Sequence, residues 1–583
     1  MRSAGINNEP RLAAVRDLFP RVPDWVILLF FFTLILLQAV PSLRQESLTF
    51  DELLRQLPGY LHLTRGEFRI HTEHPPFIKM LTALPLLLLD AKVPPPPEAW
   101  TESSRWQNAY DFLYIANDAD RLTLFGRLAV LPLTLLLGFF VFRWSKRLFG
   151  RGAAIFALFL YSFEPNILAH GRLMNTDLGV ACFLFLTMYF FSRMIQEVTL
   201  ARSLLAGLSL GMALATKYSA LWAPPILLVL GLGLLPRPMT FRFRGRPSAV
   251  VKRRVHKVLL ISGALVVIGF MALVVIWGLH GFRYEAGTTA GYGYARSWTE
   301  VLPEGRLARA AVLWAQDAKV LPEAYLHGLS VALLKVKRSA FLMGEISAEG
   351  WTHYFLVTFL LKTPLPFLLL LVLATVTVRA TWRKREVEAV FLLVPVILHF
   401  AVASGSRLNI GHRHLLPIYP FLFVLASALI PWLRQQKLAV KAVLATLAAW
   451  YFAASVFISP HYLAYFNELV GGPGRGYRYL VDSNLDWGQD LKGLKRYMEE
   501  HKIERVWLSY FGTASPTYHG ITYNYLPSYV LVPNRDRVPT PFVAISATNL
   551  QGVYFQDPEL FKKFRAREPV AKIGYSIFIY RLY

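Results

Sequence analysis

The chain has 583 residues, of which 55% are hydrophobic and only 17% are charged, and its mean hydropathy is +0.39. This composition excludes an ordinary soluble domain of the same length. The net charge of +25 does not indicate a nucleic-acid partner, because the basic residues are spread between apolar segments and do not gather on one tail. We therefore expect a membrane protein.

Apolar segments recur along the chain and are about as long as a helix that crosses a hydrocarbon core. Backbone groups inside a bilayer must pair internally, so we predict helices. About eleven transmembrane helices are expected, at 24–41, 121–142, 152–166, 177–195, 201–217, 219–236, 258–279, 363–379, 388–404, 413–433 and 442–458. The first is expected to remain as an anchor, since no small-residue cleavage site follows Pro41.

The basic residues between these segments predict the orientation of the chain. If the N-terminus is cytoplasmic, beside Arg11, Arg16 and Arg21, all of the basic connections fall on the same side. These connections contain Arg143, Lys146, Arg147, Arg151, Arg237, Arg242, Arg244, Arg246, Lys252, Arg253, Arg254, Lys257, Arg379, Arg383, Lys384 and Arg385. The longer loops are then extracytoplasmic.

Three parts follow from this arrangement: a cytoplasmic N-terminus at 1–23, a transmembrane domain at 24–458 and an extracytoplasmic domain at 459–583. The transmembrane domain contains a first outer loop at 42–120 and a central outer loop at 280–362.

The outer segments carry their own structural patterns. Asp51–Thr64 and His74–Leu89 carry apolar residues interrupted by polar ones, which is a pattern typical of helices that lie at the membrane interface. The segment from Arg306 to Lys335 has the same pattern. After 459 the pattern becomes that of a small soluble α/β domain, with a helix near Gln489–His501 and strands at Arg505–Phe511, Phe542–Ser546 and Tyr575–Leu582.

Ionisable residues near the ends of the predicted spans indicate where chemistry occurs, since such residues are costly in a membrane. They all fall toward the outer side: Arg127, Glu164, Asp177, Lys217, Lys362, His399 and Arg413. A proton-coupled transporter more often needs carboxylates at the midplane or broken helices. The one-sided charge favours an enzyme that handles a lipid phosphate.

Acidic residues in the outer segments have two readings. Asp51 and Glu52 open an outer helix, where a carboxylate in a cleft can accept a proton from an attacking hydroxyl. The same residues also suit a helix N-terminus, and that structural reading applies equally to Asp177. His71, Glu73 and His74 could hold a divalent cation, although the prolines that follow already explain a helix start.

Basic residues at the outer ends are candidates for binding a phosphate. Lys217 ends an apolar segment, where an ammonium can neutralise a departing phosphate or simply extend its amine to the interface. Arg407 and Arg413 carry guanidinium groups that bind phosphate oxygens bidentately, and lipid headgroups are the alternative ligands.

The order of several short motifs resembles the bacterial phospholipid-carrier-dependent glycosyltransferases, which belong with the protein O-mannosyltransferases and the lipid A aminoarabinose transferases (glycosyltransferase family 39-like). The motifs are Thr49-Phe-Asp-Glu52, Gly59-Tyr, Gly66-Glu-Phe-Arg69, Glu73-His-Pro-Pro76, Ala169-His-Gly-Arg172 with Thr176-Asp177, Thr216-Lys217, Lys362-Thr-Pro-Leu-Pro366, Arg413-His-Leu-Leu-Pro417, Tyr465-Phe-Asn-Glu468 and the segment Asp482 to Asp490.

The resemblance implies a GT-C architecture and an inverting transfer of sugar from a polyprenyl-phosphate carrier. Asp51 matches the catalytic acid of the first loop, with Glu52 beside it, and Asp177 matches the acid of the second loop. Lys217 matches the lysine that meets the carrier phosphate, and we assign Arg172, Arg407 and Arg413 to the same phosphate.

In some relatives the acid that matches Glu73 approaches a metal ion, so Glu73 and His74 are candidate supporting or metal-binding residues and no cofactor is strictly required. His74 stands where aminoarabinose transferases have a more basic residue, which argues against that substrate. Nothing in 280–362 resembles the β-trefoil domain of eukaryotic protein mannosyltransferases.

The expected function is therefore sugar transfer from a polyprenyl-phosphate donor to a protein hydroxyl, a lipid or a glycan. It would occur on the extracytoplasmic face of the inner (plasma) membrane, among membrane lipids and without nucleic acid. Two alternatives from other classes are a transporter or flippase of the same lipid-linked sugar and an accessory binder without catalysis.

Overall fold

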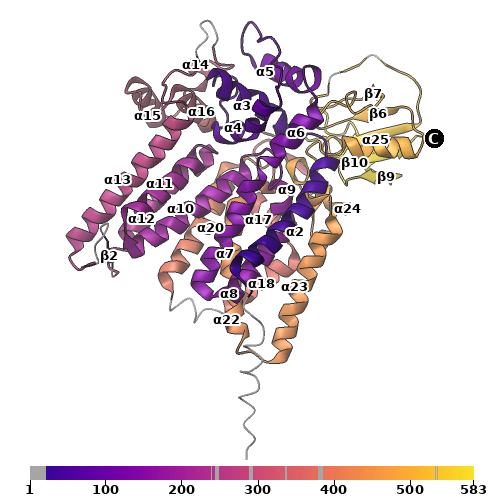
Figure 1. Ribbon diagram of the computed structural model, residues 1–583. Coiled ribbons are helices and arrows are strands. Elements are labelled where there is room, and N and C mark those ends of the chain that lie inside the picture. The colour runs from indigo at the N-terminus through magenta and orange to yellow at the C-terminus, as the bar shows by residue number, and fades with distance from the viewer. Residues whose placement is uncertain are drawn as a thin grey trace, which may run out of the picture.

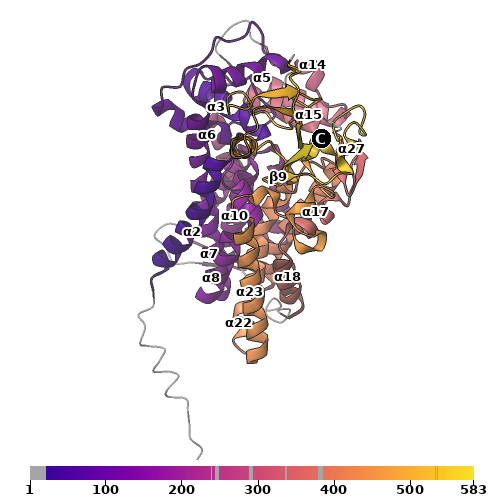
Figure 2. The same ribbon diagram turned by 90° about the vertical axis from the view of Figure 1, so that its right-hand side faces the viewer.

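The structure is a computed structural model that describes residues 22–237, 239–242, 249–287, 293–334, 338–377, 385–531, 533–534 and 536–582. A bundle of long helices forms its main body, and Figure 1 and Figure 2 show shorter helices and a small sheet gathered at one end of this bundle. At the opposite end of Figure 1 lie the short strand β2 (Met239–Phe241) and the helix α22 (Leu429–Leu433).

Seven helical segments among the described residues are long and apolar enough to cross a membrane. They are α2 (Asp24–Gln45), α6 with α7 (Ala119–Leu128 and Leu131–Phe149), α10 (Asp177–Gln196), α13 (Arg254–Leu279), α20 (Glu386–Ser406), η5 with α21 and α22 (His412–Ile418, Tyr419–Ser427 and Leu429–Leu433) and α23 (Leu438–Ile458). The predicted class, an α-helical polytopic membrane protein, is confirmed for the described residues.

The remaining four of the eleven predicted spans are also helical, but they are shorter or bent. Three are short apolar helices: α8 (Arg151–Ser162), α11 (Leu200–Leu214) and η4 with α12 (Tyr218–Trp222 and Ala223–Gly233). The fourth, predicted at 363–379, is α18 (Leu365–Thr377), which follows α17 (Tyr354–Lys362) at an angle of 108°. If this bent pair counts as one span, the total is eight.

Proline explains the break between α17 and α18. Thr363 is extended, with φ −88° and ψ 134°, and it precedes Pro364. A proline disfavours the helical conformation of the residue before it and has no N–H to donate. The predicted span at 363–379 begins at this break and corresponds to α18, whereas α17 lies before it.

Several basic residues that predicted the orientation lie outside the described residues: Arg11, Arg16, Arg21, Arg244, Arg246, Arg379, Arg383 and Lys384. The others flank described elements at the end of the bundle where β2 pairs with β1 (Glu197–Val198) and β3 (Ala249–Val251). The sidedness of the chain stays a prediction.

The first outer loop is helical, as predicted at Asp51–Thr64 and His74–Leu89. It contains η1 (Phe50–Glu52), α3 (Leu53–Arg65), α4 (Phe77–Ala83), η2 (Leu84–Leu88), α5 (Glu102–Tyr110) and η3 (Asp111–Ile115). Helices α3 and α4 approach closely at Gly59, where a Cβ would lie 1.9 Å from the carbonyl oxygen of Lys79. Only glycine permits this contact.

The central outer loop and the connections contain short elements. They are α9 (Pro165–His170), α14 (Trp298–Val301), α15 (Arg306–Asp317), α16 (Glu323–Leu333), β4 (Ala340–Leu342), β5 (Glu345–Ser347), η6 (Tyr462–Ala464), η7 (Glu468–Val470), α24 (Pro473–Gly476) and η8 (Asp482–Asn484). Helices α14 to α16 lie at the same end of the bundle as α3 and α5 (Figure 1).

The C-terminal part forms the predicted small α/β domain. Its sheet has the order β7-β6-β8-β10-β9, in which β6 is parallel to β7 and β8, and β10 is antiparallel to β8 and β9. The elements are α25 (Leu491–Glu500), β6 (Val506–Ser509), β7 (Tyr523–Tyr525), β8 (Phe542–Ser546), α26 (Ala547–Leu550), α27 (Lys562–Arg565), β9 (Ala571–Ile573) and β10 (Ile577–Arg581). Strands β7 and β9 were not predicted, since each has only three residues.

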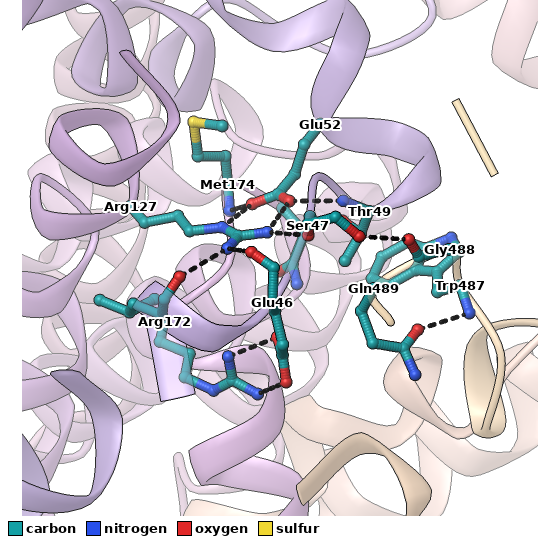
Figure 3. A network of polar contacts seen from close by, with 12 residues as sticks. Glu46, Ser47, Thr49, Glu52, Arg127, Arg172, Met174, Trp487, Gly488 and Gln489 are labelled. Atoms are coloured by element: carbon teal, nitrogen blue, oxygen red, sulfur yellow. Dashed lines mark hydrogen bonds and ion pairs between the residues drawn. The ribbon is translucent and has the colours of Figure 1, made fainter. Parts of the chain in front are cut away.

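Hydrogen bonds join this domain to the start of the first outer loop, and Figure 3 shows the one between Ser47 and Gly488. The amide of Ser47 donates to the carbonyl of Gln489 at 2.8 Å, and the amide of Phe50 donates to the carbonyl of Trp487 at 2.8 Å. The hydroxyl of Ser47 donates to the carbonyl of Gly488 at 2.9 Å. The C-terminal domain thus supports residues 47–52 directly.

A buried acid lies in the same segment of the C-terminal domain. Asp486 accepts a hydrogen bond from the amide of Thr548 at 2.8 Å, while its other carboxylate oxygen has no partner among the described residues. Burial raises the pKa of Asp486 to about 8, and the nearby Asp482 and Asp490 add to this rise. The folded state therefore binds a proton that the unfolded chain, with an ordinary aspartate pKa of about 3.9, releases.

Asp486→Asn is expected to stabilise the protein at neutral pH and to flatten its pH dependence. Between about pH 4 and 8 the native state of the wild type binds more protons than the unfolded state, so its stability falls as pH rises. Thermal unfolding of the protein in nanodiscs across this range measures the effect. Asp557→Asn, at an exposed site of the same domain, is the control; equal pH profiles for both variants would contradict the assignment.

Candidate active site

Asp51 lies in a tightly held turn at the end of the bundle that carries α3 and α5. Thr49 and Glu52 form a capping box around η1, in which the amide of Thr49 donates to the Glu52 carboxylate at 2.8 Å. The C-terminal domain fixes the same turn through Phe50, whose carbonyl accepts from the hydroxyl of Thr513 at 3.0 Å. The turn leaves the Asp51 side chain 24% exposed, whereas Glu52 is fully buried.

The Glu52 carboxylate is saturated by donors (Figure 3). Arg127 donates to both of its oxygens, at 2.9 and 2.6 Å, and the amide of Met174 donates at 2.9 Å. Arg127 also donates to the carbonyls of Leu43, Glu46 and Ser47. Glu52, and not the neighbouring Asp51, therefore stabilises the turn.

A second buried pair lies beside the first (Figure 3). Arg172 donates to both oxygens of Glu46 at 2.6 Å and to the carbonyl of Leu168 at 3.1 Å, and its side chain is fully buried. We predicted Arg172 as a phosphate ligand, but here its guanidinium is occupied by a carboxylate. The pair joins α2 to the segment that follows α9.

Arg413 is buried and lies at the centre of the site. Its Nη1 donates to Asp51 at 2.8 Å and lies 3.4 Å from Asp177, and its Nε donates to the hydroxyl of Ser483 at 3.1 Å. The guanidinium carbon lies 4.3 Å from the centre of the Trp487 ring, which is within cation–π distance. Arg413 thereby links the first outer loop, α10 and the C-terminal domain.

Glycine allows the C-terminal domain to approach Arg413. A Cβ at Gly411 would lie 2.1 Å from the hydroxyl oxygen of Ser483. That hydroxyl donates to the carbonyl of Ile410 at 2.6 Å while it accepts from Arg413. A larger residue at 411 would push η8 away from the guanidinium.

Lys217 completes the cluster from the end of α11. Its ammonium donates to Asp177 at 2.5 Å and lies 3.4 Å from Nδ1 of His414. Asp177 is held at the start of α10, where its amide donates to the side chain of Asn175. Asp177 therefore connects Lys217 with Arg413, and the structure brings together the four predicted residues Asp51, Asp177, Lys217 and Arg413.

Arg55 also belongs to this cluster, although the sequence reasoning missed it. It lies one turn after Asp51 on α3, is 1% exposed, and its Nη2 lies 3.8 Å from the Asp51 carboxylate. Its Nε and Nη1 atoms have no hydrogen-bond partner among the described residues. The i,i+4 spacing of Asp51 and Arg55 was the available signal, since such residues share a helix face.

The charge balance of the cluster is positive. Three cations, Arg55, Lys217 and Arg413, face two carboxylates, Asp51 and Asp177. Burial by itself raises the pKa of Asp51, but Arg413 and Arg55 outweigh burial and hold the pKa below its ordinary value. Asp51 is thus ionised at neutral pH, and the cluster retains capacity for an added anion.

Glu73 and His74 border the cluster without joining it. Glu73 accepts from Arg105 at 2.7 Å and lies 3.5 Å from His71. Burial opposes ionisation of Glu73, yet His71 and Arg105 lower its pKa well below the usual range. Burial lowers the pKa of His71 to about 3, so this imidazole is neutral.

No cluster of three or more metal-binding side chains occurs in the part of the chain that the structure describes. At the predicted metal site Glu73 is engaged by Arg105, and His74 offers its carbonyl to Lys79 at 2.9 Å. Their role as metal ligands stays a prediction. Arg407, another predicted phosphate ligand, is exposed at the end of α20 and is not brought into the cluster.

The family model described as dolichyl-phosphate-mannose-protein mannosyltransferase matches residues 118–241, which include Arg127, Arg172, Asp177 and Lys217. This match confirms the predicted resemblance to GT-C membrane glycosyltransferases. It covers part of the chain, and no curated protein sequence matches.

Two solved structures are similar in fold to this chain. ArnT from Cupriavidus metallidurans in the apo state is 13% identical, with 95% of this chain and 97% of that chain covered and a TM-score of 0.46. The oligosaccharyltransferase of Archaeoglobus fulgidus in the apo form is 14% identical, with 76% and 55% covered and a TM-score of 0.40.

Arg127→Met is expected to destabilise the protein strongly, because it leaves the Glu52 carboxylate buried without a counter-charge. Removal of one partner of such a pair costs about 3–5 kcal/mol. Thermal unfolding in nanodiscs should show a large loss of stability, which the double variant Glu52→Gln/Arg127→Met partly restores. Arg407→Met is the exposed control, and a loss no greater than that of the control would show that the pair does not hold the turn.

Proposed function

We propose that the protein transfers a sugar from a polyprenyl-phosphate carrier to an acceptor, at the cluster of Asp51, Arg55, Asp177, Lys217 and Arg413. The observation that carries this proposal is the buried guanidinium of Arg55, whose two unpartnered nitrogens adjoin a cluster with an excess of positive charge. Buried polar groups are nearly always hydrogen-bonded, so an anionic ligand is the natural partner. A phosphate diester at a membrane surface fits these donors.

The donor phosphate would be held by Lys217 and Arg413, with Arg55 as a third donor. Guanidinium groups bind phosphate oxygens bidentately, and a fixed ammonium stabilises charge on a leaving phosphate. In the structure Asp177 pairs with Lys217 and Asp51 pairs with Arg413. A bound phosphate would share the cations and release the Asp51 carboxylate from part of its ion pairing.

Asp51 would then serve the acceptor. The acceptor hydroxyl donates to the Asp51 carboxylate and attacks the anomeric carbon, the bond from that carbon to the phosphate oxygen breaks, and the polyprenyl phosphate leaves toward Lys217 and Arg413. The proton of the acceptor passes to Asp51. Because the pKa of Asp51 is lowered, we expect this transfer late, when the new bond has acidified the hydroxyl.

The reaction that we propose is a single displacement that inverts the anomeric configuration. Its acceptor is a protein hydroxyl, a lipid or a glycan. The site would lie on the face of the inner membrane that points away from the cytoplasm. Nucleotide sugars are scarce on that face, so the donor is a lipid-linked sugar. Residues 24–458 would form the catalytic unit and 459–583 its outer domain. Arg407 and Arg172 are left out of the phosphate site, because Arg407 is exposed and Arg172 is paired with Glu46.

A flippase for the same lipid would also need a phosphate site, and it is the second candidate. One observation favours catalysis over transport. Asp51 is an ionised and partly exposed carboxylate, and it contacts Arg413, one of the cations proposed to bind the phosphate. A flippase forms no glycosidic bond. Product formation therefore separates the two functions.

Lys217→Ala and Asp51→Asn should each abolish most sugar transfer. Loss of one preorganised donor to a leaving group costs roughly 10²–10³-fold in rate, and loss of a general base costs roughly 10²–10⁴-fold. The assay follows radiolabel from a panel of polyprenyl-phosphate sugars to membrane extract in the presence of the reconstituted protein. Arg407→Ala is the control that should keep full activity.

Two results would oppose this proposal. Full transfer by Asp51→Asn in a folded protein would exclude its role as base. Transfer from none of the donors, together with tight binding of polyprenyl phosphate, would favour the flippase or an accessory role.

A further inference from the structure

A group of aromatic rings extends from the residue next to Asp51 into the C-terminal domain. Phe50 is stacked on Phe511 at 5.4 Å between ring centres and lies 6.1 Å from Tyr529. Trp106 of α5 meets the edge of Phe50 at 5.8 Å. These rings, with Tyr554, are here called the aromatic platform.

The platform continues away from Asp51 through the second half of the domain. Tyr554 is stacked on Phe511 at 5.7 Å and lies 4.6 Å from Tyr529. Its hydroxyl bonds to the Asp482 carboxylate, in the turn before Ser483, which binds Arg413. A continuous series of contacts therefore joins Arg413 to the rings.

The aromatic platform is partly exposed, unlike a core that only packs the C-terminal domain against the first outer loop. Phe511 is buried at 3% exposure, but Tyr529 is 41% exposed, and Phe50, Trp106 and Tyr554 are half-buried. A packing core would bury the largest of these side chains, whereas an exposed ring backed by buried rings is typical of a binding surface. Tyr529 stands in ring contact with Phe50, one residue from the proposed base.

The polar groups around the rings are those that recognise hydroxyls. Asp482 accepts from the amide of Ser483 at 2.5 Å, and Arg338 lies within electrostatic range of both Asp482 and Asp51. Burial raises the pKa of Asp482, although Tyr554 and Arg413 oppose this rise. Carboxylate, phenol and guanidinium groups around aromatic faces suit a ring that has one apolar face and a rim of hydroxyls.

We infer that the aromatic platform is an acceptor subsite that binds a pyranose ring, with Tyr529 as its exposed stacking residue. This inference rests on the proposed function, because it selects a carbohydrate-bearing acceptor among the classes left open there. The ring would stack on Tyr529 and Phe50, with its hydroxyls directed to Asp482 and Arg338, and a neighbouring hydroxyl would reach Asp51. A donor sugar is held elsewhere, between Asp51 and the phosphate donors.

Binding of soluble disaccharides tests the platform without reference to catalysis. Maltose, cellobiose and lactose are titrated against the full-length protein in nanodiscs, free of maltoside detergent, and saturation transfer from the protein to the sugar is measured by NMR. We expect at least one disaccharide to bind, and Tyr529→Ala to weaken this binding about tenfold, as befits loss of one stacking contact. Tyr529→Phe keeps the ring and should bind as the wild type does.

Tyr497→Ala supplies the matched control. Tyr497 is a half-buried tyrosine of α25 in the same domain, and it stacks on His501 and not on the platform. Its variant should leave disaccharide binding unchanged. The inference is overturned if no disaccharide binds, if Tyr529→Ala binds as tightly as Tyr529→Phe, or if a serine- and threonine-rich peptide alone binds in a manner that depends on Tyr529.

The same variants separate this inference from the proposed function. Lys217→Ala should lose transfer but keep disaccharide binding, since the ammonium is part of the phosphate site. Disaccharide binding that depends on Tyr529, in a protein that transfers no sugar, would refute the proposed function and leave the subsite in place. Transfer that is insensitive to Tyr529→Ala, with no disaccharide binding, would refute the subsite alone.

Discussion

The site depends on the guanidinium of Arg413, which connects three parts of the chain. It bonds to Asp51 of the first outer loop, lies near Asp177 at the start of α10, and is held by Ser483 and Trp487 of the C-terminal domain. A guanidinium has five donors in a fixed plane, so it can satisfy several partners at once. None of these parts could shift without breaking a charged contact.

Two buried ion pairs lie behind the site and hold it rigid. Glu52 with Arg127 and Glu46 with Arg172 are nearly inaccessible to solvent, and the amides of Thr49 and Met174 complete the Glu52 shell. Such pairs gain little net stability over apolar residues but are costly to break. Here they fix the turn that presents Asp51, whose side chain is partly exposed while that of Glu52 is buried.

The C-terminal domain acquires a clear role from these contacts. It supplies Ser483 and Trp487 to Arg413, backbone acceptors to residues 47 and 50, and Phe511 to the ring of Phe50. A domain that only covered this end of the bundle would need none of these specific contacts. We interpret it as the outer wall of the site, which positions the cation and presents the aromatic platform.

The sequence predicted the membrane helices well because apolar length and basic connections are local signals. It predicted Asp51, Asp177, Lys217 and Arg413 by motif order, and the structure brings them together. It could not separate Glu52 from Asp51, or Arg172 from Arg413, because the pairing of a charge depends on contacts far along the chain, such as Glu46 with Arg172. Arg55 was missed for the same reason, since its unpartnered nitrogens are visible only in three dimensions.

Discrimination between a charged and an uncharged lipid tests the central claim most directly. Binding of a polyprenyl phosphate and of the corresponding polyprenol to the protein in nanodiscs should differ, with the phosphate bound much more tightly. Arg55→Met should reduce that preference by roughly tenfold or more, as expected for loss of a charge-assisted donor. Equal affinity for the two lipids, or a preference unaltered by Arg55→Met, would contradict the account.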